Sequence, residues 1–260
     1  MRRFFLILTL MAMAVPAVAQ NGNWTFFVGW SQAVGDFGKV DLAKNDWAFI
    51  SPNSTKGSAG MGFDLGVQYR KAIGESKMSL VFSADLLYSF PSFAVINNNR
   101  RLVHDMASNF AQVSVTNPKF VNLPLLSGVH FETGLSEGYK VYFEVQGGVA
   151  FRRCTDRSAS FVDGHNPLPI VGMELYDYIY TDHFYDSPAF AFHLSAGLVD
   201  STHWVLDLGL WHLGSMRLEG TEDLKYDPYP NSGALHHTKV SFKLGTVTPI
   251  MFTCRLGYRL

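Results

Sequence analysis

The sequence predicts an all-β chain that forms an eight-stranded antiparallel up-and-down transmembrane β-barrel. Eight segments alternate apolar and polar residues with a period of two, which is typical of strands with one apolar face. The connections between these segments are alternately long and short, as in bacterial outer-membrane barrels. Of the 260 residues, 47% are hydrophobic and 17% are charged, and the net charge is −1. This balance argues against a disordered chain and against a basic nucleic-acid-binding protein.

The first 19 residues are predicted to be a secretory signal peptide. Arg2 and Arg3 precede the apolar stretch 4–15, and the small residues Ala17 and Ala19 indicate a cleavage site before Gln20. The alternative is an N-terminal membrane anchor, but a membrane-spanning helix needs about 20 apolar residues, and this stretch is shorter. We therefore expect residues 20–260 to form the mature outer-membrane barrel domain.

Eight strands are predicted along the mature chain. They are residues 24–34, 61–72, 78–90, 120–133, 139–152, 189–199, 204–213 and 250–260. The long connections are 35–60, 91–119, 153–188 and 214–249, and the short ones are 73–77, 134–138 and 200–203. A strand of about ten residues, rising about 3.3 Å per residue and tilted by about 40°, covers about 25 Å, the height of the apolar band of such barrels. The pattern predicts long extracellular loops, short periplasmic turns and both termini on the periplasmic side.

Alternation alone does not say which face of the barrel is inside, because a soluble barrel such as a lipocalin also alternates. The apolar face carries aromatic residues near strand ends, as the girdles of membrane barrels do: Trp24, Trp30, Tyr69, Tyr88, Trp204 and Tyr258. The other face carries too many charges for a dry core unless they pair. These residues are predicted to form a polar network inside the barrel: Asp64, Arg70, Asp85, Glu132, Lys140, Glu144, Arg152, Asp207 and Arg255. The sequence therefore favours a barrel in the outer membrane of a Gram-negative bacterium, with Phe27 as an exception to the alternation.

The predicted faces also indicate strand register, since paired residues must share a face. The second and third short turns predict that Glu132 lies opposite Lys140 and that Ser195 lies opposite Asp207. An eight-stranded barrel has a narrow lumen, so we expect opposite charges to fill it rather than to line a wide channel. The glycines predicted on the inner face would leave room for these side chains: Gly62, Gly66, Gly128, Gly148, Gly197, Gly209 and Gly257.

Three short segments are similar to a known family. Segment 119–126 resembles a strand with a Pro-Leu-Leu core, segment 60–67 resembles a glycine-rich second strand, and segment 255–260 resembles a closing strand that the barrel-insertion machinery recognises. Together they resemble the PorT-like family of outer-membrane β-barrel proteins of the Bacteroidetes, which has the eight-stranded OmpA/OmpX-type architecture. The resemblance implies the fold and the location more than a function, because most members have no assigned activity. Leu260 departs from the usual terminal Phe.

His193, Ser195 and Asp207 are the candidate catalytic residues. They resemble the His-x-Ser and later acid of the outer-membrane lipid A deacylase, which is also an eight-stranded barrel. A serine hydroxyl needs a base to become nucleophilic and an acid to orient that base. The deacylase presents its site to the lipid, whereas Phe192 and Leu194 occupy the lipid side here, so His193 and Ser195 are expected to point inward. The alternative is that all three residues belong to the interior hydrogen-bond network.

The third long connection is acidic and rich in tyrosine, and four of its residues are candidates for binding a surface ligand: Tyr176, Tyr178, Tyr180 and Tyr185. The alternative is that the flanking strands continue above the membrane as a protruding sheet with aromatic cross-strand pairs. In the second long connection, residues 97–101 are predicted to form a solvated turn or to contact lipopolysaccharide phosphates through their arginines.

No metal or cofactor is predicted. The loop histidines do not have the spacing of a zinc site, and we expect them to be solvated: His104, His165, His183, His236 and His237. Cys154 and Cys254 are expected at different depths in the barrel wall, so a disulfide is not predicted.

These observations predict a non-enzymatic outer-membrane protein with a structural or surface-binding role through its four long extracellular loops. Its expected partners are outer-membrane lipid and lipopolysaccharide, the barrel-insertion machinery during biogenesis, and a surface ligand that the sequence does not identify. Two alternatives stay open, a small low-conductance pore and a lipid A-modifying enzyme.

Overall fold

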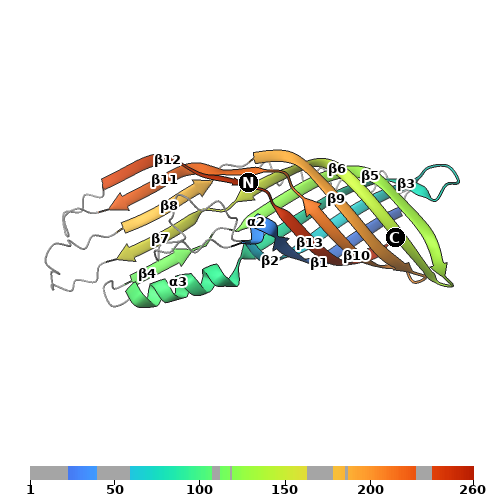
Figure 1. The fold of residues 1–260 in the computed structure, drawn as a ribbon, viewed down its shortest axis with the longest axis horizontal. Helices are drawn as coiled ribbons and strands as arrows, with labels where there is room; N and C mark the ends of the chain where they lie inside the picture. The colour runs from blue at the N-terminus through green and yellow to red at the C-terminus, as the bar shows by residue number, and fades with distance from the viewer. Residues whose placement is uncertain are drawn as a thin grey trace.

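The computed structural model describes residues 23–39, 59–106, 112–117, 119–162, 178–184, 187–226 and 236–260. Within these ranges the chain forms a closed barrel and a five-stranded sheet that extends the barrel at one end (Figure 1). The predicted signal peptide lies outside the described residues. In the part of the chain that is described, none of the helices has the length and apolar character of a membrane span.

The barrel has eight antiparallel strands, as predicted. They are β1 (Asn23–Val34), β2 (Ala59–Ala72), β3 (Met78–Pro91), β5 (Phe120–Ser136), β6 (Tyr139–Cys154), β9 (Ser187–Asp200), β10 (Trp204–His212) and β13 (Ile250–Arg259). Each barrel strand pairs with the next one along the chain, and β13 closes the barrel on β1. The start of β1, the end of β13 and the three short turns lie at one end of the barrel, and the long connections leave from the other.

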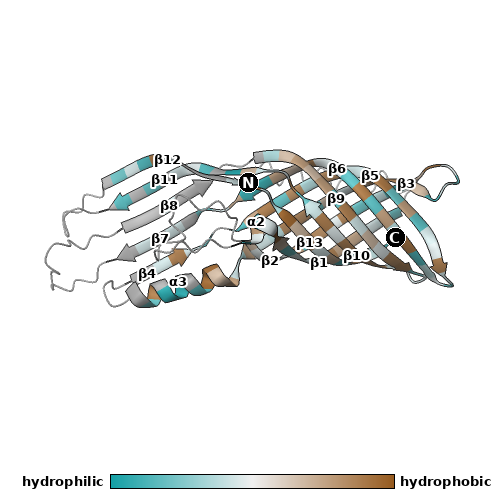
Figure 2. Cartoon of the chain, viewed as in Figure 1, coloured by the Kyte–Doolittle hydropathy of each residue, from teal (hydrophilic) through white to brown (hydrophobic). Residues whose placement is uncertain are grey.

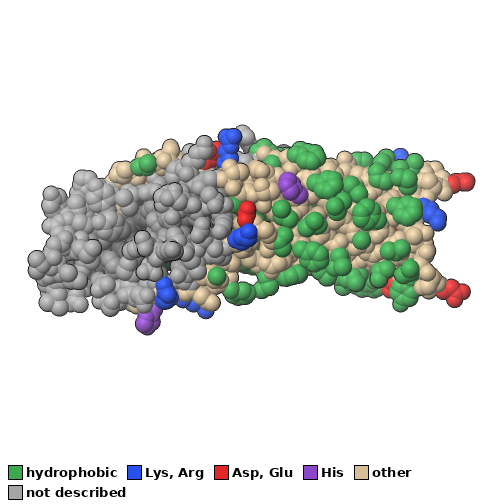
Figure 3. All heavy atoms as spheres, in the orientation of Figure 1, with side chains coloured by type: hydrophobic (Ala, Val, Ile, Leu, Met, Phe, Trp, Pro, Cys, Tyr) green, Lys and Arg blue, Asp and Glu red, His purple; other side chains and the backbone are tan. Residues whose placement is uncertain are grey.

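Apolar side chains face outward from the barrel at alternate positions. In β10, for example, Leu206 and Leu208 are exposed, whereas Asp207 between them is buried. Hydrophobic residues concentrate on the barrel strands (Figure 2). Their side chains form a belt around the barrel, and charged side chains lie at both ends of this belt (Figure 3). A closed barrel pairs all its backbone groups, so it can lie in lipid, and barrels with this belt belong to the outer membrane of Gram-negative bacteria. The protein is therefore an outer-membrane β-barrel.

The strand pairs define the tilt of the barrel. We followed the paired residues from Val34 on β1 through each strand in turn around the barrel. This path returns to β1 at Trp24, so the strands are staggered by ten residues around the full circle. For eight strands this displacement corresponds to a tilt of about 40–45°. Side chains fill the interior of a barrel of this size.

The predicted register between β5 and β6 is wrong by two residues. Glu132 pairs with Tyr142 and not with Lys140. The strands continue beyond their predicted ends to a two-residue turn, in which Gly138 has a φ of 83°, and a bulge after Gly134 absorbs one residue. Glycine adopts this left-handed conformation without steric cost, so it permits the tight turn. Because the error is an even number of residues, each residue keeps its predicted face.

The predicted register between β9 and β10 is also wrong by two residues. Asp207 pairs with Gly197 and not with Ser195. The carboxylate of Asp200 accepts hydrogen bonds from the backbone N–H groups two and four residues later, at 2.9 and 2.8 Å. These bonds hold a turn in which His203 has a φ of 73°. Val199 pairs with Val205, so the centre of the turn lies one residue later than predicted.

The outer sheet contains β4 (Gln112–Thr116), β7 (Arg157–Val162), β8 (Tyr178–Phe184), β11 (Met216–Tyr226) and β12 (His236–Val247). Its strand order is β12-β11-β8-β7-β4, so strands from three of the four long connections combine in one sheet. This is the protruding sheet that the sequence offered as the alternative to a tyrosine-rich binding loop.

Two helices lie at the outer end of the barrel, α2 (Gly35–Gly38) and α3 (Phe93–Met106). The prediction of a solvated turn at 97–101 is wrong, because these residues lie inside α3. Apolar residues recur at helical spacing in this segment, at 93, 96 and 103, and the helix runs outward beside β4 (Figure 1).

Candidate functional site

The side chain of Arg255 on β13 lies in the middle of the barrel, where it is 2% exposed and meets three carboxylates. Its Nε donates to Asp207 on β10 at 2.7 Å, and its Nη1 donates to Asp85 on β3 at 2.9 Å. The same Nη1 lies 3.6 Å from Asp64 on β2. We call these four residues the central cluster. It connects four strands across the lumen.

Aromatic side chains surround the central cluster. The ring of Phe27 lies 4.4 Å from the Arg255 guanidinium carbon, and the ring of Trp211 lies 5.7 Å from it. These contacts have cation–π geometry. The hydroxyl of Tyr142 donates to Asp207 at 2.5 Å. Phe27, the exception to the alternation of the first strand, is therefore buried inside the barrel beside the arginine.

Glycines on the inner face make room for these side chains. A Cβ atom on Gly66 would lie 2.1 Å from a carboxylate oxygen of Asp85, and one on Gly197 would lie 2.5 Å from the ring of Tyr142. Real Cβ atoms do not approach other atoms so closely, so a larger residue at either position would force its neighbour to move. The expectation that inner glycines accommodate long neighbours in a narrow lumen is met at these two sites.

A second group of charges lies at the periplasmic mouth around Glu132. Its carboxylate accepts from Arg259 at 2.8 Å and lies 3.1 Å from the Lys140 ammonium and 3.5 Å from Arg70. Lys140 is 59% exposed, so it lies at the mouth and not in the interior, where the sequence placed it. We call these four residues the mouth cluster.

Glu144 lies between the two clusters and is completely buried. Gln68 donates to its carboxylate at 2.8 Å, His130 contacts it at 2.9 Å, and Gln146 donates to it as well. His130 also contacts Arg70 of the mouth cluster at 3.2 Å, so hydrogen bonds connect Glu144 with the mouth.

The charges inside the barrel balance. Among the described residues of the interior and mouth, the cations are Arg70, Lys140, Arg152, Arg255 and Arg259, and the anions are Asp64, Asp85, Glu132, Glu144 and Asp207. Arg152 lies near the outer end, where it donates to the backbone carbonyl oxygens of Leu213, Gly214 and Ser215. With five cations and five anions this set has no formal net charge, and its buried members occupy the lumen.

The outer half of the lumen is apolar, which the sequence analysis did not anticipate. Phe37 of α2 is fully buried and packs against Phe120 with ring centroids 4.8 Å apart. Buried residues of the barrel strands and of the neighbouring connections join them in one cluster, including Leu87, Leu126, Trp211, Leu213, Met216 and Met251. Apart from the buried Arg152, the barrel is therefore filled by an apolar core toward the cell surface and by charges below it.

The three candidate catalytic residues lie inside the barrel but do not form a hydrogen-bonded triad. Among the described residues, neither ring nitrogen of His193 has a hydrogen-bond partner, and the hydroxyl of Ser195 has none either. The imidazole stacks on Trp211 at a centroid distance of 3.8 Å. The carboxylate of Asp207 is held by Arg255 and Tyr142 instead. This geometry contains no relay from acid to base to nucleophile.

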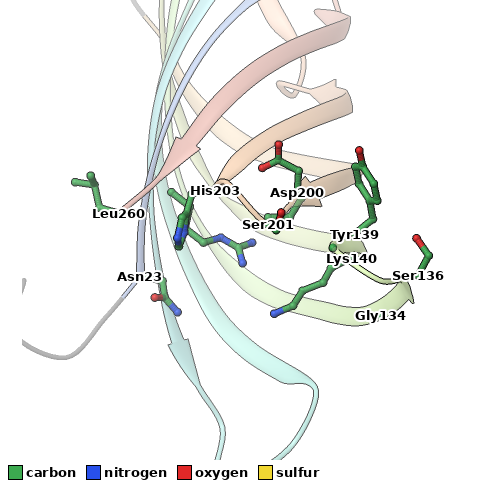
Figure 4. Close-up of a pocket in the computed structure, with 12 residues that line it drawn as sticks. Asn23, Gly134, Ser136, Tyr139, Lys140, Asp200, Ser201, His203 and Leu260 are labelled. Carbon is green, nitrogen blue, oxygen red and sulfur yellow. The ribbon is translucent and has the colours of Figure 1, made fainter.

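The periplasmic end of the barrel contains a cavity of about 530 Å³ between the short turns and the end of the chain (Figure 4). Polar side chains line it, among them Tyr139, Lys140, Asp200, Ser201 and His203. A smaller cavity of about 160 Å³ lies around members of the mouth cluster. The residues that line these two cavities include none of the central cluster.

The six residues of the predicted aromatic girdle all lie on the barrel wall and are exposed or half-buried. Four of them lie near the periplasmic ends of their strands as two ring pairs. Trp24 and Tyr69 have centroids 5.0 Å apart, and Trp204 and Tyr258 have centroids 5.3 Å apart. The other two lie toward the outer ends of β1 and β3. The positions agree with rings at the two surfaces of the belt.

The candidate binding tyrosines are only partly within the described residues. Tyr176 and Tyr185 lie outside them. The backbones of Tyr178 and Tyr180 lie on β8, in the middle of the outer sheet, where they pair with β7 and β11. Their role in binding therefore stays a hypothesis.

Four of the five histidines predicted in the long connections are described, on α3 (His104), β8 (His183) and β12 (His236 and His237). His165 lies outside the described residues, and His237 contacts Asp223 across β11 and β12 at 2.8 Å. Among the described residues, no three His, Cys, Asp or Glu side chains are grouped to hold a metal ion. Cys154 is buried at the outer end of β6, and Cys254 pairs with Trp30 within the belt, so the two differ in depth as expected.

Tyr142 and Trp211 are parts of the interior that the sequence analysis missed. An aromatic residue on the inner face extends the apolar pattern of its neighbours, so it does not stand out as polar. Parity is the signal that identifies them. Tyr142 precedes the inner-face residue Glu144 by two positions, and Trp211 follows the inner-face residue Asp207 by four.

No family model matches the chain, and no curated protein matches it in sequence. Among solved structures it is similar to Ail, the attachment invasion locus protein of Yersinia pestis, with 14% identity, coverage of 93% of this chain and 100% of that one, and a TM-score of 0.37. The outer membrane protein OprG from Pseudomonas aeruginosa has 14% identity, coverages of 92% and 96%, and a TM-score of 0.40. A major outer membrane protein from Thermus thermophilus has 12% identity, coverages of 91% and 99%, and a TM-score of 0.41. At these values the assignment to outer-membrane barrels rests on the closed sheet and belt of this chain itself.

Proposed function

We propose that this protein is a non-enzymatic, non-conducting outer-membrane barrel that holds a β-sheet on the cell surface as a structural or binding platform. The observation that carries the proposal is the outer sheet, which three of the four long connections build on a barrel with a filled interior. A sheet above the membrane offers surface for contacts, whereas a filled lumen offers solutes no path.

The proposal extends to the family and the biogenesis of the chain. The segments that resemble the PorT-like family lie on β5, β2 and β13, so they support a related barrel and not a shared ligand. We expect residues 1–19 to be removed during export and the last strand, β13, to be recognised by the barrel-insertion machinery.

Deletion of part of the outer sheet tests the platform role. Residues 216–247 contain β11 and β12, and a short turn in their place would join β10 directly to β13. The variant should keep the mobility shift between boiled and unboiled samples on a gel, because all eight barrel strands remain. Wild-type protein in detergent should bind components of an array of glycans and extracellular-matrix proteins, and the variant should lose them. Identical patterns for both proteins would contradict the proposal.

Electrical recording distinguishes the platform from a small pore. We expect no ion current through the wild-type protein in planar bilayers, because both the central cluster and the apolar core fill the lumen. Phe37→Ala removes only part of the apolar core, so this variant should not conduct either. Wild-type current steps that change with Glu144→Gln would establish a pore.

Mass spectrometry of lipid A distinguishes the platform from a lipid-modifying enzyme. We expect the same lipid A masses with and without expression of the protein, since His193 and Ser195 do not contact each other or Asp207 through hydrogen bonds. A new lipid A mass that disappears with Ser195→Ala would overturn the proposal of a non-enzymatic barrel.

A further inference from the structure

The charges of the interior and the periplasmic mouth are not evenly distributed along the barrel. The central cluster has one cation and three anions, whereas the mouth cluster has three cations and one anion. Lys77, in the turn between β2 and β3, adds a fourth cation at this end, with its ammonium 3.2 Å from the hydroxyl of Thr133. Glu144 lies behind His130 and adds a second anion. The mouth therefore has an excess of positive charge even when Glu144 is included.

The carboxylate of Glu132 is shared among the cations of the mouth cluster. Its Oε1 lies 3.1 Å from the Lys140 ammonium and accepts from Arg259 at 3.3 Å. Its Oε2 accepts from Arg259 at 2.8 Å and lies 3.5 Å from Arg70 and 3.3 Å from His130. A carboxylate has about four acceptor sites, so these contacts occupy Glu132 fully. Donors remain on both guanidinium groups, because the Nε of Arg70 and that of Arg259 have no hydrogen-bond partner among the described residues.

The smaller periplasmic cavity, of about 160 Å³, brings three of these cations together. Arg70, Lys77 and Arg259 line it, together with Asn23 and Ser79. Asn23 and Arg259 also line the larger cavity of about 530 Å³, so the two cavities adjoin at the mouth (Figure 4). Arg70 lies on the inner face of the wall and is 5% exposed, so a ligand reaches this site from the water at the mouth and not from the surrounding lipid.

The anions of the periplasmic turns do not neutralise the smaller cavity. Glu75 and Glu137 line neither of the two cavities, and Asp200 lines only the larger one. Glu132 is thus the one carboxylate among the described residues that line the smaller cavity, where it faces three cations.

We propose that the smaller cavity binds a small soluble oxyanion from the periplasm, a phosphate or a carboxylate, through Arg70, Arg259 and Lys77. Guanidinium N–H groups bind both kinds of anion with parallel, charge-assisted hydrogen bonds. The amide of Asn23 and the hydroxyl of Ser79 are further donors for the remaining oxygens. The cavity has room for several water molecules, which suits a group of this size. A bound anion also reduces the repulsion among cations that share one carboxylate. The inference depends on the mouth of the barrel and not on the outer sheet, so it is independent of the platform role.

Calorimetric titration of the purified protein in a non-ionic detergent tests the proposal, with inorganic phosphate and with succinate as probes at constant ionic strength. Arg259→Gln removes charge-assisted hydrogen bonds and should weaken binding by about tenfold or more. Lys77→Gln removes an exposed cation that lines the cavity and should weaken binding by about two- to fivefold. Its matched control is Lys71→Gln, which removes an exposed cation that lines neither cavity and should bind like the wild type.

A variant with the opposite expected effect separates binding from damage to the fold. Glu132→Gln removes the carboxylate that competes for the same cations, so it should bind the anion about fivefold more tightly. Each variant is shown to be folded by its mobility shift on a gel. If Arg259→Gln lacks this shift, Lys77→Gln and Glu132→Gln carry the test.

Binding of phosphate alone or of succinate alone supports the proposal and identifies the group that the cavity takes. Three results would overturn it. The first is that the wild type binds neither anion, and the second is that Lys77→Gln and Lys71→Gln bind equally well. The third is that Glu132→Gln binds more weakly than the wild type, because the carboxylate would then support the site instead of competing for it.

Discussion

Substitution of Arg255 by methionine should destabilise the barrel strongly. Methionine retains the apolar bulk of the side chain but removes the positive charge, which leaves Asp64, Asp85 and Asp207 buried without a counter-charge. Removal of one partner from a buried ion pair costs about 3–5 kcal/mol. With a dependence on urea of about 2 kcal/mol per M, the unfolding midpoint in detergent should decrease by about 2 M. Tryptophan fluorescence and the fraction with shifted gel mobility both report this midpoint.

Two further variants separate the loss of charge from other effects. Lys71→Met removes an exposed cation on the periplasmic end of β2 and should change the free energy of unfolding by no more than about 0.5 kcal/mol. Arg255→Met combined with Asp64→Asn, Asp85→Asn and Asp207→Asn should recover most of the lost stability, because no charge of the central cluster then remains. If Arg255→Met alone unfolds within about 0.3 M of the wild-type midpoint, the lumen solvates its carboxylates and the reasoning from a filled interior is refuted.

Three other substitutions test separate contacts of the interior by the same unfolding measurement. Gly66→Ala should lower the free energy of unfolding by about 1–3 kcal/mol, because its Cβ would lie 2.1 Å from a buried carboxylate oxygen. The control is Gly134→Ala, whose Cβ meets nothing within 4 Å. Equal unfolding midpoints for the two variants would contradict the close packing at Gly66. Tyr142→Phe should cost about 1.5–3 kcal/mol, because it removes a buried hydrogen bond to the charged Asp207, and no change would show that this carboxylate does not need the hydroxyl. Phe37→Ala should cost about 3–5 kcal/mol because the ring is fully buried, and a loss below 1 kcal/mol would show that α2 does not hold the apolar core together.

The sequence was sufficient to predict the barrel strands, because contact with lipid requires an apolar residue at every second position. That constraint acts on each strand separately, so it is visible without any knowledge of the partner strands. The position of Asp207 inside the barrel follows from it directly. The partners of Asp207 do not, since Arg255 and Tyr142 are distant in sequence and only the closed barrel brings them to one carboxylate. The apolar core was not predicted, because Phe37 lies in a long connection between strands, where no periodic pattern indicates that it is buried.

The registers show where the constraint from lipid ends. A shift of two residues leaves every outward side chain in the lipid, so the belt is equally compatible with the predicted and the observed pairing of β5 with β6. The interior distinguishes them. In the observed register His130 pairs directly with Glu144 and contacts its carboxylate at 2.9 Å, whereas the predicted register would place Gly128 opposite the same buried charge.

The same argument applies to β9 and β10. The observed register places Gly197 beside Asp207, and the space above this glycine holds the ring of Tyr142, which donates to that carboxylate. The predicted register would place Ser195 there, and its Cβ would occupy the space that the ring needs. Hydrogen bonding of buried charges and the fit of large side chains over glycine therefore select one register among those that the belt permits.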